Sequence, residues 1–476
     1  MVIFSLGYLS CSDTLDVNED PLVASSANAE LIFPTVLINL SNNRTIEISG
    51  TTGSILQYYE PVFAVIGGSA LGQLSTFTTG NTWGNYYITV LKNLVLIEND
   101  ATVAEPPNNN IIAQSQILQA FVYYLLTGLW EEVPFTEALK PEFSAPQFDR
   151  QEIILRGIVT TIDNALSLID KSEDAFRVVR GDLLYQGDMA NWERFANSLK
   201  LKALMILANK DAGVAAEIAA VLSQPLIDAL AYEAELKYYD NPGDYNPIWG
   251  LLNNFAGGTN PEWYMGSSTF QTILQDLNDP RLATFYDESD EPEVLGTGNF
   301  SPGASPGSYG ADAPQHSIVS YNILRPDFPD RYMIAAEIVL LQAEAMARGF
   351  APGGLGGADE KYRLAIQLSM DYFDSKPGEI DPVLKMDYIN SLPLLTSLSE
   401  SDAVTAIQMQ IYIADFMRMP EGWIQWRRTK VPTLVPPQGS QLSDIIRRFS
   451  YPPDEKGANP NAPGDKTLDT PMWYEN

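Results

Sequence analysis

The chain has 476 residues, with 29 lysines and arginines against 60 aspartates and glutamates, which gives a formal net charge of −31. It contains one histidine, His316, and one cysteine, Cys11, so a histidine-rich metal site, an internal disulfide and a thiol redox motif are excluded. The negative charge also argues against a broad nucleic-acid interface, which needs clustered basic residues. Aromatic residues make up 11% of the chain, too many for a disordered protein.

A short apolar run at residues 2–9 ends at Ser10 and Cys11, after which the chain becomes polar and acidic. An apolar run followed by a small residue and a cysteine is typical of a bacterial lipoprotein signal, in which the cysteine becomes the first mature residue and carries the lipid. The alternative is a buried free cysteine. The longest later apolar stretch, 117–130, is too short to span a bilayer. We therefore expect residues 1–11 to be a lipoprotein signal, with Cys11 as the lipid anchor.

The N-terminal half of the chain predicts a series of helices. An apolar stripe at i+3/i+4 spacing covers about 82–100, and the next segment, about 109–128, is apolar nearly all round, as in a helix buried inside a core. A capping-box pattern begins a third helix at Asp149. Asp188 is a candidate N-cap for a fourth helix, which the alanine-rich segment 212–222 follows.

The C-terminal half predicts three more helices. Strong helical patterns cover 333–348, 358–374 and 402–428. A glycine-rich link at 352–357 joins the first two of these segments. Helices that recur in pairs with short links are typical of a helical-repeat scaffold. The sequence therefore predicts a mostly α fold built on TPR-like helical pairs.

Two regions show no helical pattern. Residues 51–82 are rich in glycine, serine and threonine, and residues 238–330 carry proline, glycine, asparagine and aspartate with aromatic residues among them. A loop-rich insertion of this size is usually functional. The predicted organisation is one domain, 12–476, with a helical scaffold at about 82–237 and 331–430, an irregular insertion at about 238–330 and a C-terminal wrap at about 431–476.

The sequence contains no specific catalytic motif. His316 is the only imidazole, and no G-x-S-x-G surrounds a serine. The pair Glu131–Glu132 suits the two carboxylates of a glycoside hydrolase, but also a solvated helix end. The acidic run 287–291 offers oxygen ligands for Ca²⁺, but without EF-hand spacing it is more typical of a solvated charge run. We expect no catalytic residues, no cofactor and no metal.

Loop aromatics near amides and carboxylates suit amphipathic ligands. Ring faces stack on the apolar faces of such a ligand, while amides and carboxylates take hydrogen bonds from its hydroxyls. Sugars present both kinds of surface. For any single aromatic residue, local packing is the alternative role.

Several strings follow the order of one protein family. They are CSDTLDVNEDP (11–21), NTWGNYYITVLKNL (81–94), LLTGLWEEVPFTEAL (125–139), DLLYQGDMANWERFANSLKLKAL (182–204), GWIQWRRTKVPTL (422–434) and the closing MWYEN. On these strings the chain resembles the SusD/RagB-like nutrient-binding outer-membrane lipoproteins of Bacteroidetes. It departs from the family at TGLWEEVPF (127–135), usually Thr-Asp-x-Trp-Gly-Asp-Val-Pro-Tyr, and at Glu193, usually basic.

The resemblance implies an α-rich fold with TPR-like pairs, a lipid anchor on the outer membrane and no catalysis. It also implies that the protein captures an oligosaccharide or other nutrient at the cell exterior. The nutrient then passes to a SusC-like TonB-dependent transporter, on which the helical face docks. Alternative functions are an α-rich glycoside hydrolase that uses a carboxylate pair, and a pure assembly scaffold.

The resemblance places the ligand site in the early loop and the middle irregular region, which correspond here to 58–86 and 245–321. Signature residues on helices are expected to be scaffold, with Arg427 and Arg428 paired to buried acids. The predicted core residues are Trp192, Phe195, Leu199 and Leu201. The predicted ligand-binding residues are Tyr58, Tyr59, Asn81, Trp83, Tyr86, Trp249, Trp263, Tyr264 and Tyr309, of which Trp83 also fits the helix stripe as a core residue.

Replacing Cys11 tests the lipid anchor. Because only the thiol can carry the lipid, Cys11→Ala is expected to move the protein from the membrane fraction to the soluble fraction. Fractionation of cells that express either form, followed by immunoblotting, measures this. Unchanged membrane retention of the variant would contradict the anchor.

Overall fold

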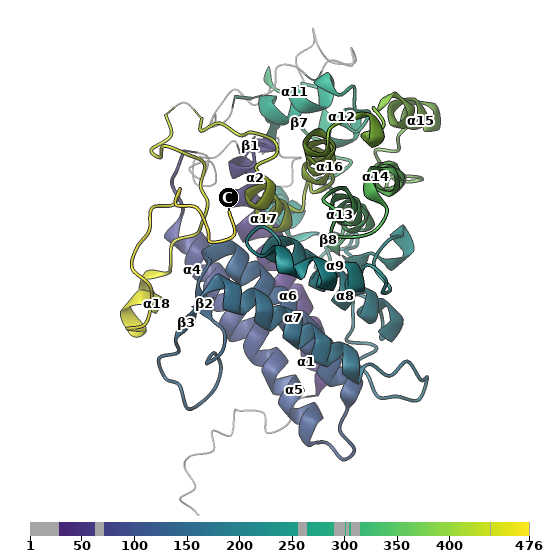
Figure 1. Cartoon of the computed structure of the whole chain (residues 1–476). Helices are drawn as coiled ribbons and strands as arrows, with labels where there is room; N and C mark the ends of the chain where they lie inside the picture. Colours follow the sequence, from purple (N-terminus) through teal and green to yellow (C-terminus); the bar gives the residue numbers. More distant parts are fainter. Residues whose placement is uncertain are drawn as a thin grey trace, which may run out of the picture.

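The protein was examined as a computed structural model, in which residues 28–61, 71–255, 264–289, 300, 304–305, 315–437 and 439–475 are described. Helices make up most of it, as predicted, and the strands are short (Figure 1). Buried apolar side chains from nearly all the helices form one continuous cluster. Trp192, Phe195, Leu199 and Leu201 are fully buried in it, which confirms their prediction as core.

The first helical run was missed by the sequence patterns. It consists of α1 (Ala29–Asn42), the π-helical turn η2 (Asn43–Ile48) and α2 (Ser49–Ile55). Every residue of α2 is buried although its sequence, SGTTGSI, has low helix propensity, so burial overrides propensity here. The prediction of a non-helical segment at 51–82 is wrong at both of its ends, because α4 begins at Thr76.

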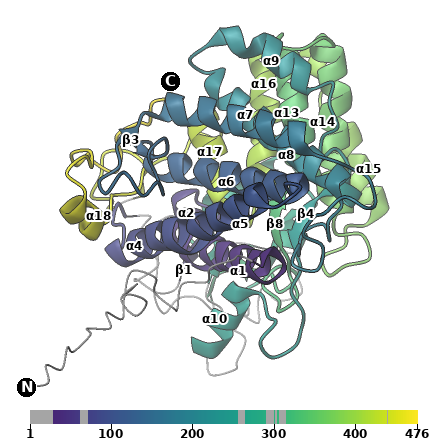
Figure 2. The same ribbon diagram turned by 90° about the horizontal axis from the view of Figure 1, so that it is seen from below.

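The helices from α4 to α9 form the first of two helical stacks. A single helical path leads from α4 (Thr76–Gly84) through η3 (Asn85–Leu91) into α5 (Lys92–Val103). Next come α6 (Asn109–Trp130), α7 (Gln151–Leu168), α8 (Met189–Leu207) and α9 (Ala215–Val221). The short turn η4 (Ala212–Val214) lies between α8 and α9. Each of α5 to α8 packs on the next, so they lie in successive layers (Figure 2).

The two predicted helix starts have different outcomes. Asp188 is the N-cap of α8, where its carboxylate accepts hydrogen bonds from the amides of Ala190 and Asn191 at 2.9 and 3.2 Å. Asp149 does not cap α7, whose N-cap is Arg150. The Asp149 carboxylate instead accepts hydrogen bonds from Thr136, so a tertiary partner replaces the local one.

The second stack comes from the C-terminal half. It consists of α13 (Ala335–Ala347), α14 (Gly354–Asp371), α15 (Pro382–Ser391), α16 (Glu400–Ala414) and α17 (Met419–Thr429), with the turn η7 (Leu395–Ser397). Helix α13 packs on α14, α16 and α8, and so joins the two stacks. The single helix predicted at 402–428 is broken after Ala414, where Met417 adopts a φ of 64°.

The segment predicted as an irregular insertion also holds short regular elements. It contains α10 (Pro247–Phe255), α11 (Ser268–Asp276) and α12 (Leu282–Phe285), with β5 (Tyr264–Gly266), β6 (Tyr286–Asp287) and β7 (Ile318–Val319). With β1 (Tyr59–Pro61) these strands form an antiparallel sheet of order β1-β5-β7-β6. Strands of two or three residues are too short for an alternating pattern, so the sequence could not reveal them.

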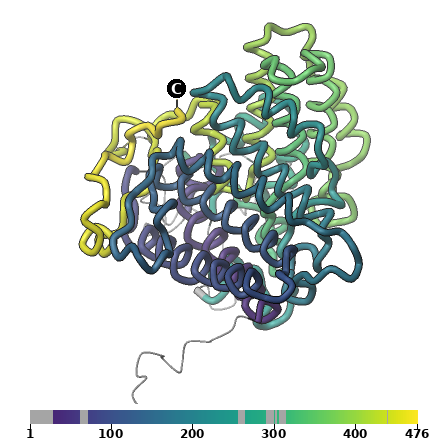
Figure 3. Tube along the Cα trace, turned by 60° about the horizontal axis from the view of Figure 1, so that its bottom comes forward, coloured from purple at the N-terminus to yellow at the C-terminus, as the bar shows by residue number. Residues whose placement is uncertain are grey.

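Two small antiparallel pairings brace the loops. β4 (Ala234–Leu236), which the turn η5 (Leu230–Tyr232) precedes, pairs with β8 (Asp330–Met333) and so joins the two ends of the middle segment. β2 (Val133–Pro134) pairs with β3 (Phe148–Asp149) and closes the loop between them. After α17 the chain follows the flank of the N-terminal helices, on the side away from α14, and carries one short helix, α18 (Pro453–Ala458) (Figure 3).

A buried ionic cluster lies where the two stacks meet. Glu337 of α13 binds Lys202 of α8 at 2.6 Å and Arg418, just before α17, at 2.9 Å, and all three side chains are at most 2% exposed. Gln425 of α17 donates a further hydrogen bond to Glu337 at 3.0 Å. Arg418 also pairs with Asp415, in the break that precedes α17. The cluster therefore ties together helices from distant parts of the chain.

Two further buried arginines, Arg44 and Arg428, form ion pairs between distant parts of the chain. Arg44 of η2 pairs with Asp330 at 3.2 Å and with Glu421 of α17. Arg428 forms a two-pronged pair with Glu344 at 2.6 and 2.7 Å, as predicted. Arg427 pairs with no acid among the residues described, contrary to prediction.

The Arg427 guanidinium donates instead to the carbonyls of Gly128 and Arg447 and lies 3.7 Å over the ring of Trp423. Burial lowers the pKa of Arg427 to about 10. Its role is thus to hold backbone carbonyls of α6 and of the C-terminal segment.

Within the described part of the chain, no helix combines the length and the apolar character needed to cross a bilayer.

Replacing Glu337 tests the ionic cluster. Burial alone would raise the pKa of Glu337, but Lys202 and Arg418 outweigh burial and lower it to about 2. Glu337→Gln leaves the buried Lys202 without its carboxylate and Arg418 with Asp415 alone, so urea unfolding at pH 7 is expected to show a loss of about 3–5 kcal/mol.

The pH dependence has a defined sign. The unfolded-state pKa of glutamate is about 4.3, so the Glu337 carboxylate contributes its full stabilisation above that pH. The gap between the wild type and Glu337→Gln is expected to shrink as the pH falls from about 4.3 towards the folded pKa of about 2. Glu193→Gln, at the exposed pair with Lys171, is the control and should cost less than about 1 kcal/mol. A pH-independent gap would contradict this role.

Candidate functional site

A cleft of about 680 Å³ opens on the flank where α4 meets the C-terminal wrap. Its first wall is α4 with η3, its second is the loop at 134–146, and its third is 452–459, which includes α18. We call it the α4–α18 cleft. Its volume lies in the range of small-ligand sites, about 300–1,000 Å³.

The α4 wall presents a mixed apolar and polar face. The Ser75 side chain caps α4 by accepting a hydrogen bond from the Phe77 amide at 3.2 Å. Phe77 and Asn81 are four residues apart on one face of α4, and Ile88 of η3 lines the cleft with them. The Phe77 and Ile88 side chains are 70% and 68% exposed, which is unusual for such large apolar groups and leaves their surface free for a ligand.

The floor of the cleft is Trp83. Its ring is 7% exposed and lies 4.9 Å from Tyr87 and 5.1 Å from Trp130, and it stacks on Phe148 at 6.0 Å. The indole NH donates to the Glu455 carboxylate at 3.3 Å. Trp83 therefore belongs both to the core, as its place in the helix stripe indicated, and to the cleft surface.

Hydrogen bonds join the second wall to the first and the third wall to the second. The Tyr87 hydroxyl donates to the Pro134 carbonyl at 2.7 Å, and burial raises the pKa of this hydroxyl. The Asn459 amide donates to the Pro146 carbonyl at 2.9 Å and to Glu455 at 3.2 Å. The cleft is thus formed before any ligand arrives, which lowers the entropic cost of binding.

The cleft is acidic. Asp454 and Glu455 line it, whereas no lysine or arginine is among its described lining residues. Behind the α4 wall, Glu47 accepts a hydrogen bond from Asn81 at 2.9 Å, and burial raises the pKa of the Glu47 carboxyl. Exposed rings beside carboxylate and amide oxygens suit a neutral ligand with many hydroxyl donors and disfavour an anion.

Of the residues predicted to bind ligand, Asn81 and Trp83 line this cleft. Trp249 does not line it and lies half-buried in α10, where its ring is 4.7 Å from that of Tyr245. Trp263, Tyr309 and the predicted anchor Cys11 lie outside the described residues.

Four other predicted residues lie in the core, which corrects their prediction as ligand contacts. Tyr58 and Tyr59 are fully buried and donate to the carbonyls of Tyr412 and Ser49. Tyr86 is also fully buried, and Tyr264 is 3% exposed, with its ring 4.3 Å from that of Tyr59. Such side chains offer a ligand no surface. Two of them lie on the short strands β1 and β5, which the sequence pattern did not reveal.

The sequence patterns also missed part of the cleft. Phe77 fell in a segment predicted to lack helix, so its position on an exposed helical face was not apparent. Asp454 and Glu455 lie far along the chain, in a segment predicted only to wrap the surface. The available signal was the proline-led acidic string PPDE, which is typical of a helix N-terminus.

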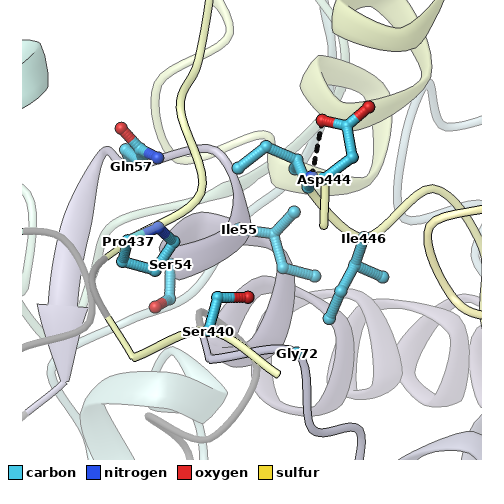
Figure 4. A pocket seen from close by; sticks show the side chains of 9 residues that line it. Ser54, Ile55, Gln57, Gly72, Pro437, Ser440, Asp444 and Ile446 are labelled. Carbon is cyan, nitrogen blue, oxygen red and sulfur yellow. Dashed lines mark hydrogen bonds between the residues drawn. The ribbon is translucent and has the colours of Figure 1, made fainter. Parts of the chain in front are cut away.

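A second hollow, shown in Figure 4, is too small for an organic ligand. It lies between α2 and the C-terminal segment, with Ser54, Ile55 and Ile446 around it, and has a volume of about 10 Å³. That is about the space of one water molecule.

Glu131 does not lie at a solvated helix end. Glu131 is 5% exposed and accepts hydrogen bonds from Arg448 and Lys466, both at 2.7 Å. Burial alone would raise the Glu131 pKa, but these two cations lower it below its ordinary value. A general acid needs a raised pKa, so Glu131 anchors the C-terminal segment instead.

Among the described residues, no group of three or more histidine, cysteine, aspartate or glutamate side chains is placed to hold a metal ion.

Comparisons with known proteins identify related folds. The model of the SusD-like family, described as "Starch-binding associating with outer membrane", matches residues 21–452. A SusD-like protein of Bacteroidetes AC2a has 21% identity over 94% of this chain and 99% of its own, with a TM-score of 0.80. A chitin-binding protein has 22% identity over 91% and 94%, with a TM-score of 0.77.

A SusD/RagB family protein from Bacteroides thetaiotaomicron has 20% identity over 94% of this chain and 99% of its own, with a TM-score of 0.77. No curated protein matches the chain.

Stability measurements should separate the floor of the cleft from its wall. Trp83→Ala removes a buried ring and is expected to lower the free energy of unfolding by about 3–5 kcal/mol. Phe77→Ala removes an exposed ring and is expected to change it by less than about 0.5 kcal/mol. Urea unfolding followed by circular dichroism measures both. Equal losses for the two variants would contradict this assignment.

Proposed function

The chain belongs to the SusD-like family, and on that premise we propose that it binds a saccharide nutrient in the α4–α18 cleft. The observation that carries the proposal is the exposed Phe77 ring, on one wall with the Asn81 amide and facing carboxylates across a preformed cleft. An aromatic ring stacks on the apolar face of a sugar, while amide and carboxylate oxygens accept hydrogen bonds from its hydroxyls.

The proposed ligand is a neutral oligosaccharide. The lining charges of the cleft are those of Asp454 and Glu455, which repel a uronate but accept hydrogen bonds from hydroxyl or acetamido groups. The similar fold of a chitin-binding protein and the starch-binding description of the family support a saccharide. We keep starch-type and chitin-type oligosaccharides as the two ligands to compare.

The proposed role is capture without turnover. The family description is one of binding. In the pair Glu131–Glu132, which suggested hydrolysis, Glu131 forms ion pairs with Arg448 and Lys466 and so has a structural role. The described residues of the cleft offer no pair of carboxylates on opposite walls, because Asp454 and Glu455 are neighbours on α18. A hydrolase needs one acid on each side of the scissile bond.

We further propose that residues 12–476 act as one domain, anchored at the outer membrane through Cys11 and facing the cell exterior. From there the protein delivers its ligand to a SusC-like TonB-dependent transporter. Co-purification of such a transporter with the tagged full-length protein, from detergent-solubilised envelopes, tests this partner.

Calorimetric titration of the full-length protein with maltoheptaose and with chitohexaose tests the ligand. One of them is expected to bind, and Phe77→Ala and Asn81→Ala should each weaken binding about tenfold, or ~1.4 kcal/mol. Thr405→Ala, which changes an exposed residue of α16 well outside the cleft, is the matched control and should bind normally. Chromatography of the same mixtures should show intact sugar. Shortened products, or binding unaffected by both cleft variants, would contradict the proposal.

A further inference from the structure

A second groove, of about 660 Å³, lies along α1. Residues of α1 form one side, and the segments 179–186 and 236–245 form the others. We call it the α1 groove. It shares no lining residue with the α4–α18 cleft, so any ligand it takes is bound independently.

The floor of the α1 groove is apolar and aromatic. Leu236 is buried beneath it, whereas Ile38 and Leu183 are 42% and 37% exposed on its sides. The Tyr238 hydroxyl shares a hydrogen bond with the Ser41 hydroxyl at 2.6 Å, which holds the ring in place. Tyr239 is 56% exposed on the rim, where its ring face is free to stack on a ligand.

Both rims are rigid. On one side, the buried Asp182 carboxylate accepts hydrogen bonds from the amides of Leu184 and Gly187 and from the indole of Trp192, at 3.1, 2.9 and 2.7 Å. On the other, the Tyr239 amide donates to the Asp244 carbonyl at 2.9 Å and closes a turn. A groove that is already ordered loses little entropy when a ligand binds.

Unlike the cleft, the α1 groove has two cations in its lining, which equal its two acids in number. Arg180 and Lys237 line it, both are exposed, and neither takes part in an ion pair within the described portion of the chain. Asp182 is the buried acid of the lining, and its oxygens are already engaged by donors. The one exposed acid is Asp244. Two free cations in a strongly acidic protein therefore meet in one groove.

We propose that the α1 groove binds a short acidic oligosaccharide, one that carries uronate groups. The two cations take its carboxylates, the Tyr239 ring stacks on a sugar face, and the amides of Asn42 and Gln186 reach its hydroxyls. The groove accepts the charged sugars that the acidic cleft repels. The proposal does not depend on the ligand of that cleft.

The argument for a saccharide is one of size and lining. A volume of about 660 Å³ matches a ligand of a few rings rather than a protein surface, which is larger and flatter. The exposed Tyr239 ring, in a lining that also holds the amides of Asn42 and Gln186, suits hydroxyl-rich rings. A simple anion such as phosphate would use the cations but leave the aromatic floor unused.

Calorimetric titration of the full-length protein with tri-galacturonate tests the proposal. Its methyl ester, which has the same rings without charge, is the matched probe. At low ionic strength, tri-galacturonate is expected to bind at least about tenfold more tightly than the ester. Its binding is expected to weaken as added salt screens the exposed cations. Equal binding of the two probes, or no binding of tri-galacturonate, would overturn the proposal.

Variants place the probe in the groove. Arg180→Gln with Lys237→Gln should weaken tri-galacturonate binding at least about tenfold, and Tyr239→Ala should weaken it as well. Lys92→Gln, an exposed lysine on α5, removes a charge elsewhere and should bind normally. Thermal unfolding should be unchanged in all of them, because every altered side chain is exposed.

The variant results are decisive in both directions. Binding that survives the Arg180/Lys237 double variant, or that Asn81→Ala abolishes instead, would mean that the probe occupies the α4–α18 cleft and would overturn the proposal. If neutral sugars fail to bind while tri-galacturonate binds through the groove, the proposed function of the cleft fails and this inference stands.

Discussion

The fold depends on the buried carboxylate of Glu337 and its two cations, Lys202 and Arg418. Burying any of these charges alone would cost several kcal/mol, so each requires the others to be in place. They come from three parts of the chain and meet only when α8, α13 and α17 have packed. The cluster therefore restricts how the two helical stacks can be joined.

This junction has a direct effect on the α4–α18 cleft. Once α17 is fixed, the chain leaves it along the flank of the N-terminal helices, where Arg427 holds the carbonyls of Gly128 and Arg447. Glu131 then holds Arg448 and Lys466 on either side of α18. The third wall of the cleft is thus positioned by contacts made in the scaffold. The surface of the cleft is composite, with rings from the first quarter of the chain and carboxylates from its end.

The sequence predicted the scaffold better than the site. Long helices with strong apolar periodicity, such as α6 and α8, were located because their own residues encode them. The helix α2 and the strand β1 were missed, since their conformation depends on burial supplied by the rest of the molecule. Tyr58 and Tyr59 look like loop aromatics for the same reason, although their rings fill the core.

The contrast between Asn81 and Asp454 shows why the site itself was only half predictable. Asn81 lies in the segment 81–94, which the family resemblance identified. The residues around Asp454 do not indicate that it lines a cleft with α4. Which segments meet across a cleft is decided by packing over hundreds of residues, and no short pattern records it. In the same way, Arg180 and Lys237 become a pair only in the folded α1 groove.

The hydrogen bond between Trp83 and Glu455 joins residues that are 372 positions apart. Closing a loop of that size costs conformational entropy before the contact itself can form. A chain that lacks its last segment has no carboxylates opposite α4. The third wall of the α4–α18 cleft is therefore complete only once the end of the polypeptide has been made and has packed on the scaffold.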